Sequence, residues 1–210
     1  MKHVSHALSI LVCVVAAVAP SEGRGNPLAA QYRTDAQAIL LVAQPGLRDP
    51  NFHASVVLVT RTSEGQNLGV ILNRPTEIEL RRIAPPGAAL DRYDDVVYFG
   101  GPVLPQLPVA LLRSASAPAG AAFRVLAQVY LTMHPDNIAA LLAGGDTRYR
   151  LYAGFSAWGP GQLEREIALG SWLILPADED SLLRPDTSGL WDELLARANA
   201  RKASLRATAR

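Results

Sequence analysis

The chain has 210 residues, of which 49% are hydrophobic and 19% are charged, so it is long enough for one ordinary globular domain, and this composition excludes a disordered chain. Its 20 basic residues nearly balance its 19 acidic residues, and a net charge of +1 gives no support for direct nucleic-acid binding. The single cysteine excludes a disulfide within the chain.

Residues 1–25 are predicted to be a signal peptide and linker that precede the fold. Lys2 is followed by an apolar run over residues 8–18, which has the length of a signal peptide and is shorter than the roughly 20 residues of a membrane-spanning helix. Ala17-Val18-Ala19 supplies a small-residue pattern for cleavage. We therefore expect a periplasmic or otherwise exported protein. An uncleaved membrane anchor and a cytoplasmic protein with a misassigned start are the alternatives.

The rest of the chain begins with short strands. Apolar runs that are rich in β-branched residues and bounded by turn formers predict strands over residues 38–43, 54–60, 68–73, 96–99, 109–112, 124–131, 148–155 and 172–175. These runs are nearly continuous rather than alternating, so we expect part of the sheet to be covered on both faces. The segments 83–95 and 114–122 are predicted loops.

Helices are predicted mainly in the C-terminal half. They span residues 135–143, 159–169 and 179–183, and a last helix follows the cap Asp186-Thr187-Ser188. The second of them has Pro160 at its first helical position and Gly170 as its stop. Together these elements predict a single α+β domain over residues 26–200, with a mixed, largely antiparallel sheet and several packed helices.

The inventory of reactive side chains excludes several kinds of site. Once the leader is removed, His53 and His134 are the only histidines and no cysteine remains, so neither a zinc cluster nor a cysteine nucleophile can form. Lysine occurs only at Lys2 and Lys202, which excludes a P-loop lysine in the core. The acidic run 178–180 suits the start of a short helix better than a hard-metal site. We expect no metal and no cofactor.

Two local patterns resemble catalytic or phosphate-binding motifs. Ser156 is predicted to lie at a strand-to-helix turn, but a nucleophile elbow needs glycine where Trp158 stands, so we interpret this serine as a turn residue. Gly159-Pro160-Gly161 opens a helix, although Glu164 occupies the third glycine position of a dinucleotide fingerprint. The free N–H groups at this helix start could hold an anion. No catalytic residue is assigned.

The last ten residues, 201–210, are predicted to form a basic tail. Its basic residues are Arg201, Lys202, Arg206 and Arg210, and Arg197 lies just before them. A solvated helix end explains them, and weak attraction to a membrane surface or to an acidic partner is the alternative.

Five motifs occur in order along most of the predicted domain. They are Pro45-Gly46-Leu47-Arg48-Asp49-Pro50-Asn51-Phe52 with Ser55-Val56-Val57, Gly69-Val70-Ile71-Leu72-Asn73-Arg74-Pro75, Gly100-Gly101-Pro102-Val103, Gly154-Phe155-Ser156-Ala157-Trp158-Gly159-Pro160-Gly161-Gln162-Leu163-Glu164 with Glu166, and Trp172-Leu173 with Pro176-Ala177-Asp178. In order and spacing they resemble the YqgE/AlgH family of bacterial proteins. One branch of that family is named for the transcriptional regulation of alginate production, and no enzymatic activity is established for the family.

The chain also departs from the family pattern. Residues 107–112 replace a stretch that usually contains arginine and histidine, and Phe155 replaces a tyrosine. The predicted leader is unusual for a family that is regarded as cytoplasmic.

Seven motif residues are candidate ligand contacts: Asp49, Asn73, Arg74, Ser156, Trp158, Gln162 and Glu166. Arg74 could clamp a carboxylate or phosphate, or pair with Asp49 or Glu166. Asp49 also suits a turn, Trp158 suits packing, and Gln162 could cap its helix.

The resemblance implies a non-enzymatic regulatory protein that binds an unidentified protein or a small anionic ligand. One alternative is an anion site or unrecognised enzyme built on Arg74, Gly159-Pro160-Gly161, Glu164 and Glu166. Another is an envelope structural protein attached through the leader and the tail. Direct DNA binding is not supported, because no helix-turn-helix and no basic recognition surface are visible.

Overall fold

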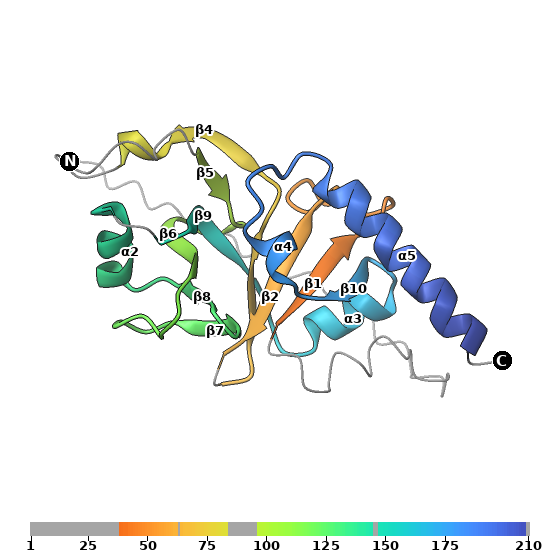
Figure 1. Ribbon diagram of the computed structural model, residues 1–210. Coiled ribbons are helices and arrows are strands. Elements are labelled where there is room, and N and C mark those ends of the chain that lie inside the picture. Colours follow the sequence, from red (N-terminus) through yellow and green to blue (C-terminus); the bar gives the residue numbers. More distant parts are fainter. Residues whose placement is uncertain (1–37, 63, 84–95, 145–146, 209–210) are drawn as a thin grey trace, which may run out of the picture.

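The computed structural model describes residues 38–62, 64–83, 96–144 and 147–208 (Figure 1). The predicted signal peptide and linker, and nearly all of the predicted loop 83–95, lie outside the described residues.

The described residues form ten strands, four α-helices and one short 3-10 helix. The strands are β1 (Ala38–Ala43), β2 (Val56–Arg61), β3 (Asn67–Ile71), β4 (Pro75–Glu79), β5 (Val96–Phe99), β6 (Val103–Arg113), β7 (Phe123–Leu126), β8 (Val129–Thr132), β9 (Tyr149–Trp158) and β10 (Trp172–Pro176). The helices are η1 (Leu80–Arg82), α2 (Pro135–Leu142), α3 (Gln162–Ala168), α4 (Glu179–Leu182) and α5 (Leu190–Thr208).

The strands form one curled sheet in the order β10-β1-β2-β3-β9-β6-β8-β7, with every neighbouring pair antiparallel. β4 pairs with β5, and β5 runs parallel to β9, with Tyr98 opposite Tyr152. The predicted single α+β domain with a mixed, largely antiparallel sheet is confirmed.

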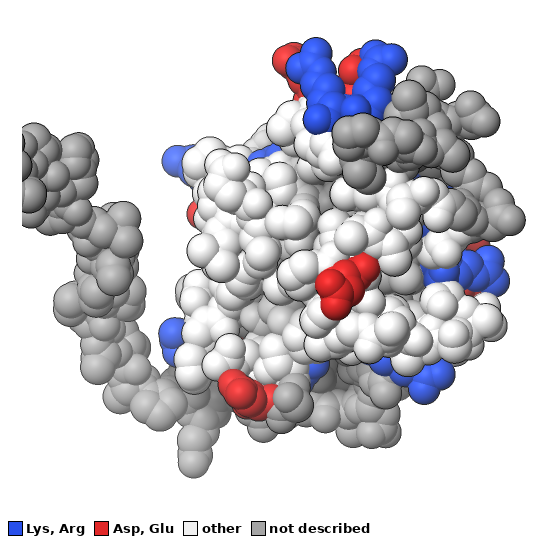
Figure 2. All heavy atoms as spheres, turned by 90° about the vertical axis from the view of Figure 1, so that its left-hand side faces the viewer, with Lys and Arg blue, Asp and Glu red and all other residues white. Residues whose placement is uncertain are grey.

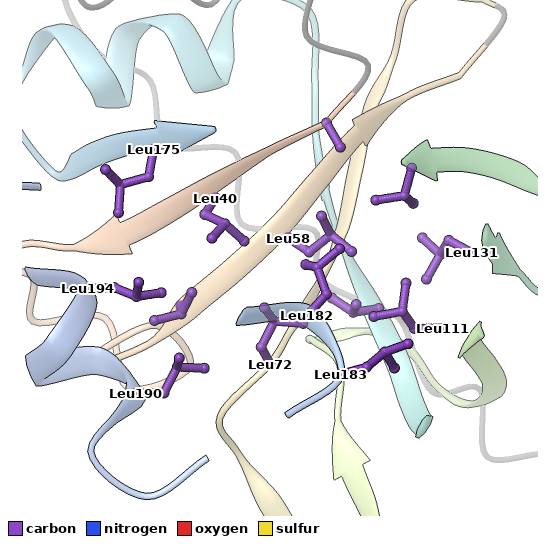
Figure 3. Packing of buried hydrophobic residues seen from close by; sticks show 14 of the residues in the cluster. Leu40, Leu58, Leu72, Leu111, Leu131, Leu175, Leu182, Leu183, Leu190 and Leu194 are labelled. Atoms are coloured by element: carbon purple, nitrogen blue, oxygen red, sulfur yellow. The ribbon is translucent and has the colours of Figure 1, made fainter. Parts of the chain in front are cut away.

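Helices cover both faces of the sheet at the β1 end, as the continuous apolar runs predict. Every residue of β1 is buried, and alternate side chains face opposite helices. Leu40 packs in one cluster with Leu194 of α5, whereas Leu41 packs in another with Leu163 of α3. Figure 3 shows the first cluster, in which leucines of the strands meet leucines of α4 and α5. Burial of each of these leucine side chains contributes about 1.5–3 kcal/mol to the free energy of folding.

β9 joins the two halves of the sheet. Two motif glycines, Gly100 and Gly154, allow the backbone of the Gly100 turn to pack directly against β9. Gly154 lies in the middle of β9 with φ +70, a conformation that side chains disfavour. A Cβ atom on Gly100 would lie 2.2 Å from the carbonyl oxygen of Gly154. The close approach of the two backbones therefore explains why glycine occupies position 100 of the Gly100-Gly101-Pro102 turn.

Several predicted boundaries are wrong. The predicted strand 124–131 is a hairpin, β7 and β8, with Ala127 and Gln128 at its turn; neither residue is a typical turn former. The strand β4 went unpredicted because it lies at an edge and is mostly exposed.

The predicted turn after β9 is also misplaced. β9 continues through Trp158, so Ser156 is a buried strand residue rather than a turn residue. Pro160 lies outside the helix, which begins only at Gln162 after Gly161 in a left-handed conformation with φ +70. At the other end of the domain, residues 201–208 of the predicted tail continue α5.

One face of the molecule carries few charged side chains. Figure 2 views it from the left-hand side of Figure 1, where α2, β7 and β8 lie. In the part that is described, this face gives no electrostatic support for nucleic-acid binding. No helix among the described residues is both long and apolar enough to cross a membrane.

Candidate functional site

Three of the seven candidate residues meet around one carboxylate. Oε2 of Glu166 accepts hydrogen bonds from the indole nitrogens of Trp158, at 3.1 Å, and Trp172, at 2.9 Å. Its Oε1 accepts a bond of 3.0 Å from the Gln162 amide, whose own oxygen accepts from the backbone N–H of Gly159. We call Trp158, Gln162, Glu166 and Trp172 the Glu166 cluster. Both of its carboxylate oxygens are occupied.

The Glu166 cluster connects three elements of the fold. Trp158 ends β9, Glu166 lies on α3, and Trp172 begins β10. Both indoles are buried, and the Phe52 ring packs against them with centroid distances of 6.2 and 5.7 Å. The arrangement joins a helix to two strands through charge-assisted hydrogen bonds. Ligand binding here remains a prediction.

A second group of candidate residues braces the loop that follows β1. Asn73 accepts from the backbone N–H of Val56 at 2.9 Å and donates to the carbonyl of Ala54 at 3.0 Å. These two bonds replace strand pairing at the point where β3 ends. Asp49 accepts from the N–H of Asn51 at 2.8 Å, which is the turn interaction that its sequence position predicts.

Arg74 holds the same loop by its carbonyl groups. Nη1 donates to Pro50 at 3.0 Å and to Asn51 at 2.7 Å, and Nη2 donates to His53 at 2.9 Å. Within the described residues Arg74 forms no salt bridge, so neither predicted carboxylate, Asp49 or Glu166, is its partner. An anion at Arg74 remains a prediction.

Ser156 stands apart from both groups. Its hydroxyl is buried and donates to the carbonyl of Gly100 at 3.1 Å, which fastens the glycine turn to β9. His134 is also structural, because its Nδ1 accepts from the N–H of Asp136 at the start of α2. Among the described residues, no three His, Cys, Asp or Glu side chains gather as they would around a metal ion.

Two adjoining cavities lie between the start of β9, α4 and the α4–α5 connection, and of the described residues that line them only Asp178 belongs to the five motifs. The larger, of about 500 Å³, is lined by Arg113, Arg148, Asp178, Glu179, Asp180, Ser181, Leu183, Arg184, Pro185, Glu193 and Arg197. The smaller, of about 220 Å³, is lined by Leu80, Val96, Tyr98, Arg148, Tyr149, Arg150, Leu151, Leu183 and Pro185. Arg148, Leu183 and Pro185 belong to both.

Three ion pairs line the larger cavity. The ion pairs are Arg113 with Glu179 at 3.3 Å, Arg184 with Glu193 at 2.6 Å, and Arg197 with Asp178 at 2.6 Å. Burial raises the pKa of Asp178, but hydrogen bonds from Arg197 and Ser181 outweigh it and hold that pKa below its ordinary value. Asp178 also caps α4 by accepting from the N–H of Ser181 at 2.9 Å.

The smaller cavity has two guanidinium groups and no carboxylate in its wall. Arg148 donates to the carbonyl of Leu183, and Arg150 donates to those of Leu182, at 3.5 Å, and Arg184. The guanidinium carbon of Arg150 lies 4.4 Å from the Tyr98 ring centroid, a cation–π contact. Arg150 is only 9% exposed. In the part of the chain that is described, neither arginine forms a salt bridge.

A buried hydroxyl lies beside this arrangement. Tyr152 is 1% exposed, its ring meets Tyr98 edge-on at 6.1 Å, and its hydroxyl has no partner in good hydrogen-bond geometry, although Arg150 lies near enough to lower its pKa against the effect of burial. Burial raises the pKa of Tyr152 to about 12, which keeps the phenol neutral.

The sequence contains a weak signal for the smaller cavity. Arg148 and Arg150 are two residues apart at the start of a strand, a spacing that places both on one face. What covers that face, the α4–α5 connection, comes from more than 30 residues later in the chain and cannot be read from local pattern.

Comparison with known proteins gives consistent results over most of the chain. A family profile described as AlgH-like matches residues 40–203. A UPF0301 protein of Myxococcus xanthus is 38% identical over 159 residues, which cover 74% of this chain and 87% of that protein. A UPF0301 protein of Mycobacterium tuberculosis is 34% identical over 188 residues, covering 86% of this chain and 91% of that protein.

Two solved structures share the fold. A protein of Corynebacterium diphtheriae superposes with a TM-score of 0.62 at 26% identity, covering 78% of this chain and 87% of that one. The AlgH protein of Pseudomonas aeruginosa superposes with a TM-score of 0.61 at 28% identity, covering 79% of this chain and 88% of that one.

Proposed function

This chain belongs to the YqgE/AlgH family, an uncharacterised family, and from that premise we propose that it acts as a non-enzymatic binding protein whose ligand occupies the two adjoining cavities. Ligand binding would serve a regulatory role, because the α4–α5 connection forms a wall of both cavities and also has exposed residues, Pro185, Asp186 and Ser188, that a protein partner could contact.

The observation that carries this proposal is the contrast in how polar groups are used. Motif residues that might have served a reaction, such as Glu166, Arg74 and Ser156, donate to or accept from neighbours in the fold. Among the described residues, the histidines His53 and His134 lie in a loop and at a helix start, without a nucleophile hydrogen-bonded to either. The cavities, by contrast, offer polar walls and space.

A ligand screen tests the proposal. The full chain would be heated with a set of anionic, neutral and cationic metabolites, and each mixture would then be analysed by mass spectrometry. We expect a saturable rise in Tm, of about 5–10 °C at a hundredfold excess over Kd, with the ligand recovered unchanged. Conversion of a ligand would overturn the non-enzymatic proposal, and the absence of any response would overturn ligand binding.

We also propose that residues 1–25 direct export and that the basic end of the chain attracts a membrane surface or an acidic partner. The intact mass of the protein from separated periplasm, cytosol and membranes tests the first point. A mass short by the leader in the periplasm supports it, whereas a full-length cytosolic protein contradicts it. Salt-sensitive membrane association that is lost on deletion after Leu195 would support the second.

A further inference from the structure

The smaller cavity differs from the larger one in the balance of its charges. Its wall holds Arg148 and Arg150 and no acidic residue. Elsewhere around the two cavities, arginines face carboxylates within 3.3 Å. A guanidinium remains charged at any physiological pH, so the two positive charges in this wall are balanced by carbonyl dipoles and one aromatic ring.

Both guanidinium groups retain unused donors. A guanidinium has five N–H bonds, and the hydrogen bonds of Arg148 use only Nη2. Those of Arg150 to carbonyl groups use one N–H of Nη1 and one of Nη2, so its guanidinium also has donors beyond these two bonds. The positive charges and the spare donors therefore occur on the same two side chains. An oxyanion satisfies both, because carboxylate and phosphate oxygens match the planar fork of arginine.

The other residues of the wall are apolar except for Tyr98 and Tyr149, each of which carries a hydroxyl. Leu80, Val96 and Leu183 line it together with Pro185 and the ring of Tyr98. The volume of about 220 Å³ exceeds the roughly 150 Å³ in which an apolar cavity accommodates benzene. There is thus room for a flat apolar group of that size with a charged substituent.

We propose that this cavity binds a small organic oxyanion, a carboxylate or phosphate carried on a flat apolar body, with its charge at Arg148 and Arg150 and its body against Tyr98 and Leu183. The inference rests on the proposed binding function and adds the chemical class of the ligand and the residues that select it. The larger cavity fits such a ligand less well, because all its arginines except Arg148 are already paired with carboxylates, and its wall also contains Asp180.

Calorimetric titration of the full chain with four probes tests this assignment. Benzoate and phenyl phosphate carry both features, inorganic phosphate carries the charge alone, and benzyl alcohol carries the flat body alone. We expect saturable binding of at least one of the first two and weaker binding of the last two. Which of the first two binds more tightly identifies the oxyanion.

Arginine variants show whether binding occurs in this cavity. Arg148→Ala is the primary variant, because Arg148 is exposed and makes one backbone hydrogen bond, so its loss should leave the fold intact. We expect Kd to rise about tenfold or more. Arg150→Lys retains the charge without the fork and should weaken binding while circular dichroism remains unchanged. Arg165→Ala, an exposed arginine of α3, is the control and should leave Kd unchanged.

Three results would overturn the inference: no binding of benzoate or phenyl phosphate, equal binding of benzyl alcohol, or an unchanged Kd in Arg148→Ala. If the protein fails these tests but responds to another compound in the wider screen, the binding function survives and this ligand class is wrong. If nothing in either set binds, both proposals fail.

Discussion

The Glu166 cluster and the smaller cavity use the same kind of interaction in opposite ways. In the cluster, one carboxylate accepts from two buried indoles and an amide, so each of its oxygens already has a partner within the fold. In the cavity, two guanidinium groups donate to backbone carbonyls and keep donors in reserve. The polar groups of the first region are engaged within the fold, whereas those of the second retain donors for the ligand that we propose.

This difference separates residues that identify the family from residues that are available for function. Glu166, Asn73 and Arg74 lie in motifs, and each hydrogen-bonds segments distant in the chain. Arg148 and Arg150 lie in none of the five motifs. Motif residues here are therefore expected to govern stability, and the cavity arginines are expected to govern binding.

The largest effect on stability is expected from substitution of Glu166, which tests whether the Glu166 cluster has a structural role. Glu166→Ala leaves the indole N–H groups of Trp158 and Trp172 without an acceptor in a largely buried site. We expect the free energy of unfolding to fall by about 2–4 kcal/mol in urea titration. Glu64→Ala, an exposed glutamate with no side-chain partner among the described residues, should change it by less than about 0.5 kcal/mol. Equal effects of the two variants would contradict a structural role for the cluster.

Arg74 offers a sharper test, because the sequence also predicts it as an anion clamp. Arg74→Ala removes three hydrogen bonds to the loop carbonyls of Pro50, Asn51 and His53, so we expect a loss of about 1–3 kcal/mol in stability. The Kd for phenyl phosphate should not change. A normal stability with weakened anion binding would move the site to Arg74.

A smaller change in stability is expected when the hydroxyl of Tyr152 is removed. Because the group is buried without a partner, Tyr152→Phe should leave the free energy of unfolding unchanged or raise it by up to about 1 kcal/mol. Tyr98→Phe, which removes a hydroxyl 3.4 Å from the Thr187 hydroxyl, serves as the matched comparison. Marked destabilisation by Tyr152→Phe, measured by thermal unfolding, would mean that this hydroxyl has a partner in solution.

The smallest expected effect concerns acid stability at the α4 cap. The folded-state pKa of Asp178 is held below its ordinary value of 3.8, so its contribution to stability is complete above that pH and is lost as the pH falls further. The difference in Tm between the wild type and Asp178→Asn should therefore shrink as the pH is lowered below about 3.8. Asp180→Asn, on the same helix but without a side-chain partner in the described chain, should show no such trend.

Sequence pattern predicts the parts of this molecule that are set locally. The continuous burial of β1 and the proline start of α2 follow from composition and capping. The end of β9 does not, because the local pattern predicts a turn at Ser156, whereas in the structure this serine lies in the strand beside the glycine turn at Gly100.

In the candidate site, too, contacts between residues close in the sequence can be anticipated, and contacts between distant segments cannot. Trp158, Gln162 and Glu166 are close in the sequence, and in the structure they are joined by hydrogen bonds to the Glu166 carboxylate. The sequence cannot show that Trp172 supplies a second indole, or that Arg148 and Arg150 meet carbonyls from the α4–α5 connection, because both depend on long-range packing.

Nuclear magnetic resonance titration of the ¹⁵N-labelled chain with phenyl phosphate tests the central claim most directly. The account predicts saturable shifts of the amides of residues 148–151 and 183 and of the arginine Nε–H signals of Arg148 and Arg150, with the indole signals of Trp158 and Trp172 unmoved. Shifts centred on those indoles, on residues 159–166 or on Arg74 would place binding at the motifs and contradict it.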